Sequence, residues 1–210
     1  MNDIDNYIKT HNITKLHLGC GANIIKDWLN TDISKDVIKK GKAVYLDVTK
    51  PFDISDSTFD YIFSEHLFEH LTYEEGMNMI NECYRILKPG GVMRLSTPSL
   101  EFLIDLYYHP DKEINKEYLK FDAKRANTPI GAVYAISHFH TAWNHKIIYD
   151  SDSLHNILIN AGFKKVYKCE VGESEYESLR NIENHFRHFK RLGCVYDFNK
   201  LQSMIFEAQK

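Results

Sequence analysis

The chain has 210 residues, and its 26 basic and 29 acidic side chains give a formal net charge of −3 at pH 7. This length fits one large domain, which can bury roughly 70% of its unfolded surface and therefore needs no disulfide or metal ion to fold. The nearly neutral charge argues against a protein that coats nucleic acid, and 43% hydrophobic residues argue against disorder. Histidine (11 residues), tyrosine (13) and phenylalanine (12) are frequent, and composition alone assigns them no role.

The four cysteines, Cys20, Cys83, Cys169 and Cys194, are scattered and form no C-x-x-C pair. A zinc ribbon or a disulfide framework is therefore not expected, and a reducing cytosol is the natural environment. The N-terminus has no basic region followed by an apolar region, and no run approaches the ~18 apolar residues that span a bilayer. We expect a cytoplasmic protein without a membrane span.

Short apolar runs alternate with helical patterns over the first 150 residues, which favours an α/β sheet. The expected strands are residues 15–18, 29–33, 43–48, 59–64 and 91–96, followed by a late strand over 163–171.

The clearest helix lies between the fourth and fifth expected strands. Thr72 and Glu75 have capping-box spacing, and apolar residues follow at helical intervals. The Lys88-Pro89-Gly90-Gly91 turn ends this helix, because proline cannot continue the hydrogen-bond ladder. A second helix is expected from about Ser151.

Residues 100–146 differ from this alternation. They contain helical stretches over 100–108 and 113–125 and then an irregular segment rich in His, Gly and aromatic residues. We expect a single domain over residues 1–210, with a Rossmann-like, mostly parallel α/β sheet, helices on both faces and an antiparallel late strand. Residues 100–146 would form an insertion or lid over the active-site edge, and the tail from residue 175 to 210 is expected to be helical.

The sharpest local feature is Leu16-His17-Leu18-Gly19-Cys20-Gly21-Ala22-Asn23. A strand that runs into two closely spaced glycines lets a ligand approach the backbone at the carboxyl edge of a parallel sheet. A simple tight turn is the structural alternative. A dinucleotide fingerprint would need a third glycine where Ile24 stands, so that cofactor class is disfavoured.

Two acids follow at expected strand ends. Asp32 comes after the second strand, where a carboxylate can accept hydrogen bonds from ribose hydroxyls, and Asp47 closes the third strand. Solvated turn aspartates are the alternative at both positions.

Together these positions resemble the class I S-adenosylmethionine-dependent methyltransferases. The matching segments appear in order along the chain: Leu18-Gly19-Cys20-Gly21, Trp28-Leu29-Asn30-Thr31-Asp32, Leu46-Asp47-Val48, Phe59-Asp60-Tyr61-Ile62, Glu65-His66-Leu67-Phe68-Glu69-His70-Leu71, and Glu82-Cys83-Tyr84-Arg85-Ile86-Leu87-Lys88-Pro89-Gly90-Gly91. The resemblance covers about residues 15–98 and 145–171. It implies S-adenosyl-L-methionine as the cofactor and methyl transfer as the reaction.

The resemblance also implies roles for individual residues. The cofactor-binding set would be Gly19, Cys20, Gly21, Asp32, Ile33, Asp47, Val48 and Ser64, with the glycines under the methionine part, Asp32 on the ribose, and Asp47 with Val48 beside the adenine. Ser64 and Glu65 would lie near the sulfonium and the acceptor. The interval of 13 residues from Gly19 to Asp32 leaves little room for a full helix, which puts the role of Ala22 and Asn23 in doubt.

The segment from His66 to His70 also matches H-x-x-E-H, an inverted zinc-protease motif. On one α-helix the two histidines would share a face as zinc ligands. The strand directly before the motif and the methyltransferase pattern argue against a zinc-dependent hydrolase, and no metal is expected.

A second histidine cluster, residues 137–145, can be a packed surface loop or part of an acceptor site. Histidine suits deprotonation of a hydroxyl or amine near neutral pH, so the expected catalytic residues are His70, His145 and Glu65. The expected acceptor is the O or N atom of a small molecule or a sugar-like compound. Nucleic acid is disfavoured by charge, although the Arg187–Arg191 segment is locally basic. The alternative is a protein that binds the cofactor without a competent acceptor site.

Overall fold

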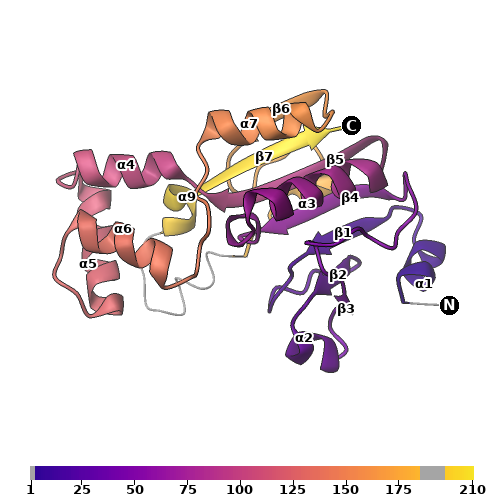
Figure 1. The fold of residues 1–210 in the computed structure, drawn as a ribbon, viewed down its shortest axis with the longest axis horizontal. Helices are drawn as coiled ribbons and strands as arrows, with labels where there is room; N and C mark the ends of the chain where they lie inside the picture. Colours follow the sequence, from indigo (N-terminus) through magenta and orange to yellow (C-terminus); the bar gives the residue numbers. More distant parts are fainter. Residues whose placement is uncertain (1–2, 185–196) are drawn as a thin grey trace.

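The computed structural model describes residues 3–184 and 197–210 (Figure 1). Seven strands form one sheet in the order β3-β2-β1-β4-β5-β7-β6. Their bounds are β1 Lys15–Leu18, β2 Leu29–Asp32, β3 Val44–Tyr45, β4 Phe59–Glu65, β5 Leu87–Pro98, β6 Lys165–Cys169 and β7 Ser203–Gln209. Strands β1 to β5 pair in parallel, whereas β7 is antiparallel to both β5 and β6.

Helices connect these strands and extend beyond the end of the sheet (Figure 1). Their bounds are α1 Asp3–Thr10, α2 Lys35–Lys39, α3 Tyr73–Ile86, α4 Leu100–Tyr108, α5 Glu113–Ala126, α6 Ala132–Thr141, α7 Ser151–Asn160 and α9 Phe198–Gln202, with 3₁₀ turns η1 Phe68–His70 and η2 Glu177–Leu179. Over the described ranges, no helix is both long and apolar enough to cross a membrane.

The Rossmann-like, mostly parallel α/β sheet expected from the sequence is confirmed. The capping box of α3 is also confirmed, since the Thr72 side chain accepts from the Glu75 amide and the Glu75 side chain accepts from the Thr72 amide. Two strand bounds differ from the expectation. Strand β3 is only two residues long, and β5 begins at Leu87, directly after α3, because Leu87 already pairs with Phe59 before a bulge.

The prediction of a helical C-terminal tail was wrong for residues 203–209, which form strand β7. Met204, Phe206 and Ala208 alternate into the main core, while Glu207 faces the other side of the sheet and pairs with the buried Arg94. A charged residue inside this short alternating pattern obscured the strand signal. The late strand expected over 163–171 is β6, and the antiparallel strand is β7.

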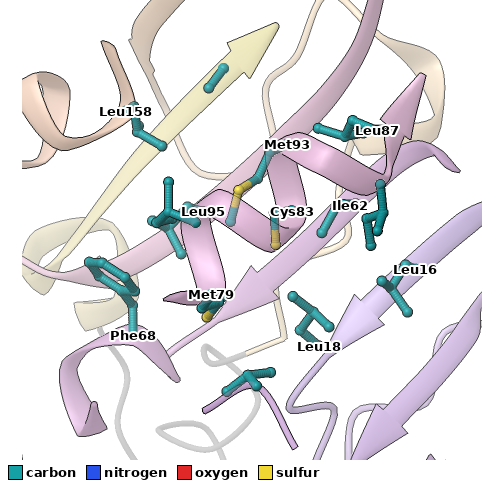
Figure 2. Close-up of a cluster of buried hydrophobic side chains, with 14 of the residues drawn as sticks. Leu16, Leu18, Ile62, Phe68, Met79, Cys83, Leu87, Met93, Leu95 and Leu158 are labelled. Carbon is teal, nitrogen blue, oxygen red and sulfur yellow. The ribbon is translucent and has the colours of Figure 1, made fainter. Parts of the chain in front are cut away.

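The main core lies between one face of the sheet and helices α1, α3 and α7. Figure 2 shows its centre, where side chains of β1, β4, β5, α3 and α7 meet. Leu16, Leu95, Met79 and Leu158 are all fully buried there.

The other face of the sheet buries polar groups beside a smaller apolar cluster. Trp28, Phe63, Val92 and Leu179 form that cluster, so the described residues that cover this face belong to loops and to η2 rather than to the expected α-helices. Arg94 on β5 is fully buried, and its guanidinium forms ion pairs with Glu207 and Glu183. The network ties β7 and the segment before residue 184 to the middle of the sheet.

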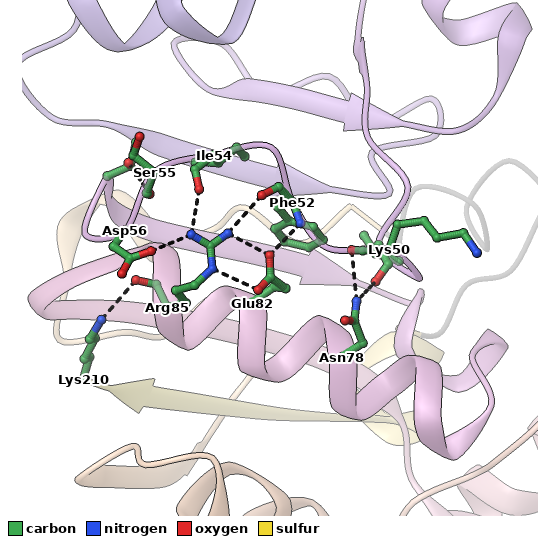
Figure 3. A network of polar contacts seen from close by, with 11 residues as sticks. Lys50, Phe52, Ile54, Ser55, Asp56, Asn78, Glu82, Arg85 and Lys210 are labelled. Atoms are coloured by element: carbon green, nitrogen blue, oxygen red, sulfur yellow. Dashed lines mark hydrogen bonds and ion pairs between the residues drawn. The ribbon is translucent and has the colours of Figure 1, made fainter.

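A polar network holds the loop between β3 and β4 against α3 (Figure 3). Arg85 donates to the carbonyl oxygens of Phe52 and Ile54 and forms ion pairs with Asp56 and Glu82. The bonds to Glu82 and Asp56 hold the guanidinium of Arg85 charged, raising its pKa above an already high value. The Arg85 side chain thus supplies hydrogen-bond donors to carbonyl oxygens that have no partner in regular secondary structure.

Residues 100–146 form three helices that leave the carboxyl end of β5 and pack together with α9 beyond the sheet (Figure 1). Their shared core contains Phe102, Leu106, Tyr118, Phe139 and Phe198. This helical cluster stands at the sheet edge where the β1 and β4 strands end.

Truncation in the main core should cost stability where the sheet and α7 meet. We expect Leu158→Ala to lower the free energy of unfolding by about 2–5 kcal/mol, because it leaves a cavity among fully buried side chains. The next residue on the same helix, Ile159, is 40% exposed, and Ile159→Ala should cost less than about 1 kcal/mol. Equilibrium urea unfolding of both variants measures the difference, and equal losses would contradict this placement of α7.

Candidate active site

The glycine loop after β1 adopts a conformation that glycine favours. Gly19 has φ +62° and Gly21 has φ +49°, both in the left-handed region. A Cβ on Gly19 would lie 2.8 Å from a methyl group of Leu67, so a larger residue there would collide with the segment after β4. The backbone of the loop is anchored by a hydrogen bond from the Cys20 amide to the Thr31 carbonyl oxygen, 2.9 Å long.

This loop forms one side of a cavity of about 360 Å³ at the carboxyl edge of the sheet. The opposite side is formed by the segment after β4, by the helical cluster, and by Asn184 and Gln202. The lining residues are Gly19, Cys20, Gly21, Ala22, Asn23, Glu65, His66, Glu69, His70, Pro98, Tyr118, Arg125, Phe139, Trp143, His145, Asn184 and Gln202. The cavity therefore joins residues far apart in the sequence.

The topology explains why these segments meet. Strand order reverses beside β1, whose neighbours are β2 and β4, and Leu18 lies opposite Ser64 in register. The loops that follow β1 and β4 consequently leave the sheet side by side. In open α/β sheets this switch point is where ligands bind.

Asp32 at the end of β2 positions the glycine loop. Its carboxylate accepts one hydrogen bond from the Gly21 amide and another from the Ser34 amide, each 2.7 Å long. A carboxylate has further lone pairs, so it can still accept from a ligand hydroxyl. Desolvation raises the pKa of the neighbouring Cys20 thiol to about 12, with the Asp32 charge as the second cause.

Asp32 and the remaining expected cofactor residues are not among those that line this cavity. Ile33 is 61% exposed, and Asp47 caps its own turn by accepting from the amide and hydroxyl of Thr49. The Val48 side chain is buried in the main core. Ser64 is fully buried on β4, and its hydroxyl has no hydrogen-bond partner within the described part of the chain.

Glu65 lines the cavity, and its carboxylate is already held by hydrogen bonds. Both of its carboxylate oxygens lie 3.0 Å from the backbone amide nitrogen of Asn184, and the Asn184 side chain donates a hydrogen bond to the Asn23 side chain in the glycine loop. This chain of contacts makes Glu65 a residue that holds two walls of the cavity together.

Glu69, next to the expected His70, is the most unusual group in the cavity. It is fully buried, and its Oε2 accepts from the Thr97 hydroxyl at 3.0 Å. Its Oε1 has no hydrogen-bond partner among the described residues. Burial raises the pKa of this carboxyl group, and its own backbone together with the charges of His70 and His145 opposes the shift.

Three imidazoles surround this oxygen. His66 Nδ1 lies 3.3 Å from Glu69 Oε1 without hydrogen-bond geometry, and the Nε2 atoms of His70 and His145 lie 3.9 and 4.0 Å away. Burial lowers the pKa of His145 to about 4 and that of His66 to about 3, so both rings are neutral at pH 7. The His70 and His145 rings meet edge to face at 4.9 Å.

The structure therefore brings His70, His145 and Glu65 into the same cavity as the glycine loop. The segment 66–70 does not form the α-helix that a zinc-protease motif requires, because His66 has φ +50° and residues 68–70 form a 3₁₀ turn. His66 Nε2 is instead 2.8 Å from the Ser203 hydroxyl.

The aromatic wall of the cavity comes from the helical cluster. Tyr118, Phe139 and Trp143 line it, and the Arg125 guanidinium lies 5.2 Å from the Trp143 ring centroid. Not every histidine of the 137–145 cluster lines the cavity. His138 instead contacts Asp122, and His140 is exposed.

Sequence reasoning missed several lining residues. Glu69 belongs to the quoted H-x-x-E-H motif, and its place before His70 was the available signal. Tyr118, Arg125 and Gln202 come from helices whose packing the sequence did not indicate, and no local pattern marked them. The locally basic segment Arg187–Arg191, like Cys194, lies outside the described residues. Cys20, Cys83 and Cys169 are free thiols.

Comparison with known proteins agrees with this arrangement. A family profile described as "Methyltransferase domain" matches residues 16–95, the segment that includes the glycine loop and the Glu69 turn. Residues 16–95 are thus similar to a methyltransferase domain, in agreement with the resemblance to the class I S-adenosylmethionine-dependent methyltransferases. A search of curated protein sequences found no match to the chain.

Solved structures share its fold. A SAM-dependent methyltransferase from Archaeoglobus fulgidus is 20% identical, with 99% of this chain and 90% of that one covered and a TM-score of 0.55. One from Mesorhizobium loti is 16% identical, with 98% and 96% covered and a TM-score of 0.52. Phosphoethanolamine N-methyltransferase 2 of Haemonchus contortus, in complex with S-adenosyl-L-methionine, is 15% identical, with 94% and 48% covered and a TM-score of 0.51.

The cofactor implied by the similarity to a methyltransferase domain is S-adenosylmethionine, and the glycine loop has the room that it needs. A Cβ built on Gly21 would meet no atom within 4 Å, and the residue lines the cavity. The Asp32 carboxylate directly beneath adds an acceptor for hydroxyl groups. The glycine loop and Asp32 therefore fit S-adenosylmethionine.

A single methyl group at Gly21 should interfere with the cofactor. We expect Gly21→Ala to weaken S-adenosylmethionine binding by about tenfold or more, equivalent to about 1.4 kcal/mol, because the Cβ enters the space beside the loop. Gly90 is a matched control, since it also has positive φ and open space but lies in the turn between α3 and the body of β5. Titration calorimetry should show wild-type affinity for Gly90→Ala; equal losses in both variants would point to backbone strain alone.

Proposed function

We propose that the protein is an S-adenosylmethionine-dependent methyltransferase that acts on an O or N atom of a small-molecule or sugar-like acceptor bound in the 360 Å³ cavity. The observation that carries this proposal is the shared cavity, in which the cofactor loop faces a wall of imidazole and aromatic side chains. A protein that only binds the cofactor would need no second wall. The acceptor would therefore lie between the loop and residues 139–145.

The cofactor's methionine part would lie along Gly19, Cys20 and Gly21, with its ribose on Asp32. Its adenine would extend past Ile33 toward the turn at Asp47 and Val48. Since the Val48 side chain packs in the core, its contribution there would come from the backbone. The buried Ser64 hydroxyl, without a partner in the described chain, would lie beneath the centre of the cofactor.

The chemistry that S-adenosylmethionine supplies is a methyl group on a positively charged sulfur, open to in-line displacement. The protein's task is to hold donor and acceptor close and collinear, and such positioning can supply roughly 7–11 kcal/mol of the barrier. A carboxylate on the sulfur would favour the ground state, whose charge disperses during transfer. Asp32 and Asp47 are accordingly assigned to the nucleoside end.

His70 and His145 are the groups assigned to the acceptor's reacting atom. Both line the cavity, and the His145 ring is held between His70 and Phe139 by edge-on contacts of 4.9 and 5.2 Å. Glu65, with both oxygens on the Asn184 amide, positions the walls rather than moving a proton. The remaining acceptor contacts would be aromatic faces.

Residues 100–146 would form the lid of this single domain. Helix α6 and the turn after it supply Phe139, Trp143 and His145, so the position of the helical cluster sets the width of the cavity. The cluster has its own apolar core, which lets it move as a unit. Water exclusion on closure would strengthen the electrostatic contacts inside.

The direct test is binding and turnover. Titration calorimetry should show binding of both S-adenosylmethionine and S-adenosylhomocysteine, and failure of both would contradict the cofactor site. Methyl-labelled cofactor is then incubated with a panel of hydroxyl and amine metabolites. Transfer to one class identifies the acceptor; binding without transfer to any acceptor, nucleic acids included, would favour the non-catalytic alternative.

The placement of the adenine can be tested separately. Asp47→Ala should weaken cofactor affinity by about tenfold or more, because the turn that would flank the adenine loses its cap at Thr49. Asp152→Ala, at an exposed site on α7, is the control and should bind normally. Unchanged affinity for Asp47→Ala would place the adenine elsewhere.

The lid can be tested through one aromatic residue. Trp143→Ala should raise the KM for the acceptor by about tenfold, since burial of a large aromatic contact contributes about 1–3 kcal/mol, and should leave cofactor affinity unchanged. Tyr134 on the same helical cluster is similarly exposed and does not line the cavity, so Tyr134→Ala should behave as wild type. Steady-state kinetics with the acceptor found above decides this, and equal effects of the two changes would argue against an acceptor at Trp143.

A further inference from the structure

We propose that Glu69, His70 and His145 bind a divalent first-row transition-metal ion in the cavity, and that this ion binds a hydroxyl group of the acceptor. Each of the three offers one ligand atom, and these atoms all lie within 4.8 Å of one another. The proposal rests on the function above, because the same cavity contains the glycine loop.

The carboxylate provides an observation independent of this clustering. Glu69 is fully buried, and its Oε1 lies within 4.0 Å of the imidazoles of His66, His70 and His145 without a hydrogen-bond partner among the described residues. A buried oxygen left unpaired costs free energy that a cation would recover. His145 Nδ1 is likewise buried without a partner in the described chain.

Hydrogen bonds between Glu69 and the two ligand histidines do not explain the arrangement, and His66 Nδ1, 3.3 Å from Glu69 Oε1, lacks hydrogen-bond geometry. The Nε2 atoms of His70 and His145 lie 3.9 and 4.0 Å from Glu69 Oε1, beyond hydrogen-bond length. Ligands of a tetrahedral ion with bonds of about 2.1 Å lie about 3.4 Å apart. Each imidazole nitrogen would therefore approach Glu69 Oε1 by about 0.5 Å, and ligand atoms as far apart as 4.8 Å would approach each other by about 1.4 Å. That separation fits a cation between the groups better than a direct contact.

The surroundings resemble the outer shell of a metal site. Thr97 on β5 donates its hydroxyl proton to Glu69 Oε2, which directs Oε1 toward the histidines. The amides of Lys146 and Ile147 donate to the Glu69 carbonyl oxygen and so fix the chain that follows His145. Such second partners orient metal ligands in proteins.

The donor set selects the class of ion. Two imidazoles and one carboxylate suit Zn²⁺, Mn²⁺, Fe²⁺ or Co²⁺, whereas Mg²⁺ and Ca²⁺ favour oxygen ligands alone. Three protein ligands leave coordination positions open toward the cavity, as catalytic sites require. The ligands differ from those of the H-x-x-E-H hydrolase motif, because here the glutamate is a ligand and His66 is held by Ser203.

An ion at this place would make a hydroxyl, rather than an amine, the acceptor. Binding of the hydroxyl oxygen to a divalent ion lowers its pKa. In the transfer the O–H proton leaves to water, the oxygen forms the bond to the methyl carbon, and the electrons of the breaking C–S bond stay on sulfur. The products are a methyl ether, S-adenosylhomocysteine and a proton.

The test measures metal binding without any acceptor. Protein freed of metal by chelation is titrated with Mn²⁺ and followed by electron paramagnetic resonance, and with Zn²⁺ by calorimetry. We expect one ion per chain. Glu69→Gln and His70→Ala should each weaken binding by about tenfold or more, and His70→Ala guards against a folding defect because the His70 side chain is 35% exposed. His109→Ala, an exposed histidine held by Asp105, should bind as wild type.

Cofactor calorimetry on the same samples separates the two proposals. Metal binding lost in His70→Ala with S-adenosylmethionine binding retained supports the site. No binding of either ion to wild-type protein that still binds S-adenosylmethionine would overturn the metal site and leave the proposed function standing. Equal loss in His109→Ala would overturn the assignment to these ligands. Loss of cofactor binding in wild-type protein would instead contradict the proposed function.

Discussion

The buried carboxylate of Glu69 is the constraint around which the active-site edge is arranged. Its Oε2 accepts a hydrogen bond from the Thr97 hydroxyl at the end of β5, and its carbonyl oxygen accepts hydrogen bonds from the two backbone amides that follow His145. One residue thus connects the end of the sheet, the turn after β4 and the exit of the helical cluster. Because a buried charge is costly unless it is paired, everything around Glu69 must either neutralise it or supply a cation.

The sheet places this residue opposite the glycine loop. Strand order reverses at β1, so the loops after β1 and β4 leave the sheet together, and Leu67 packs directly on Gly19. The helical cluster then closes the third side with Phe139 and Trp143. Cofactor loop, buried carboxylate and aromatic wall are therefore consequences of one topology, and the proposed metal site occupies the point where they converge.

Much of the fold could be predicted because its signals are local. The capping box of α3, the glycine pair after β1 and the apolar runs of β1 and β4 each depend on residues adjacent in the sequence. Strand β7 could not be predicted in this way, since Glu207 is a buried charge on its second face and is paired there by Arg94, more than a hundred residues earlier, and by the Tyr167 hydroxyl. Residues 100–146 were predicted to form an insertion, but their packing with α9 depends on contacts across the chain.

The sequence by itself determined the class of sheet, the glycine loop and the choice of two histidines that line the same cavity, because each is marked by residue types at fixed short spacing. Only the tertiary structure decided which neighbours matter. Ile33 and the Val48 side chain lie away from the cavity. Glu65 accepts a hydrogen bond from the backbone amide of Asn184, and Glu69 Oε1 lies near the imidazoles of His70 and His145. Burial and distance are properties of the folded chain, and they turn a carboxylate in a motif into a candidate metal ligand.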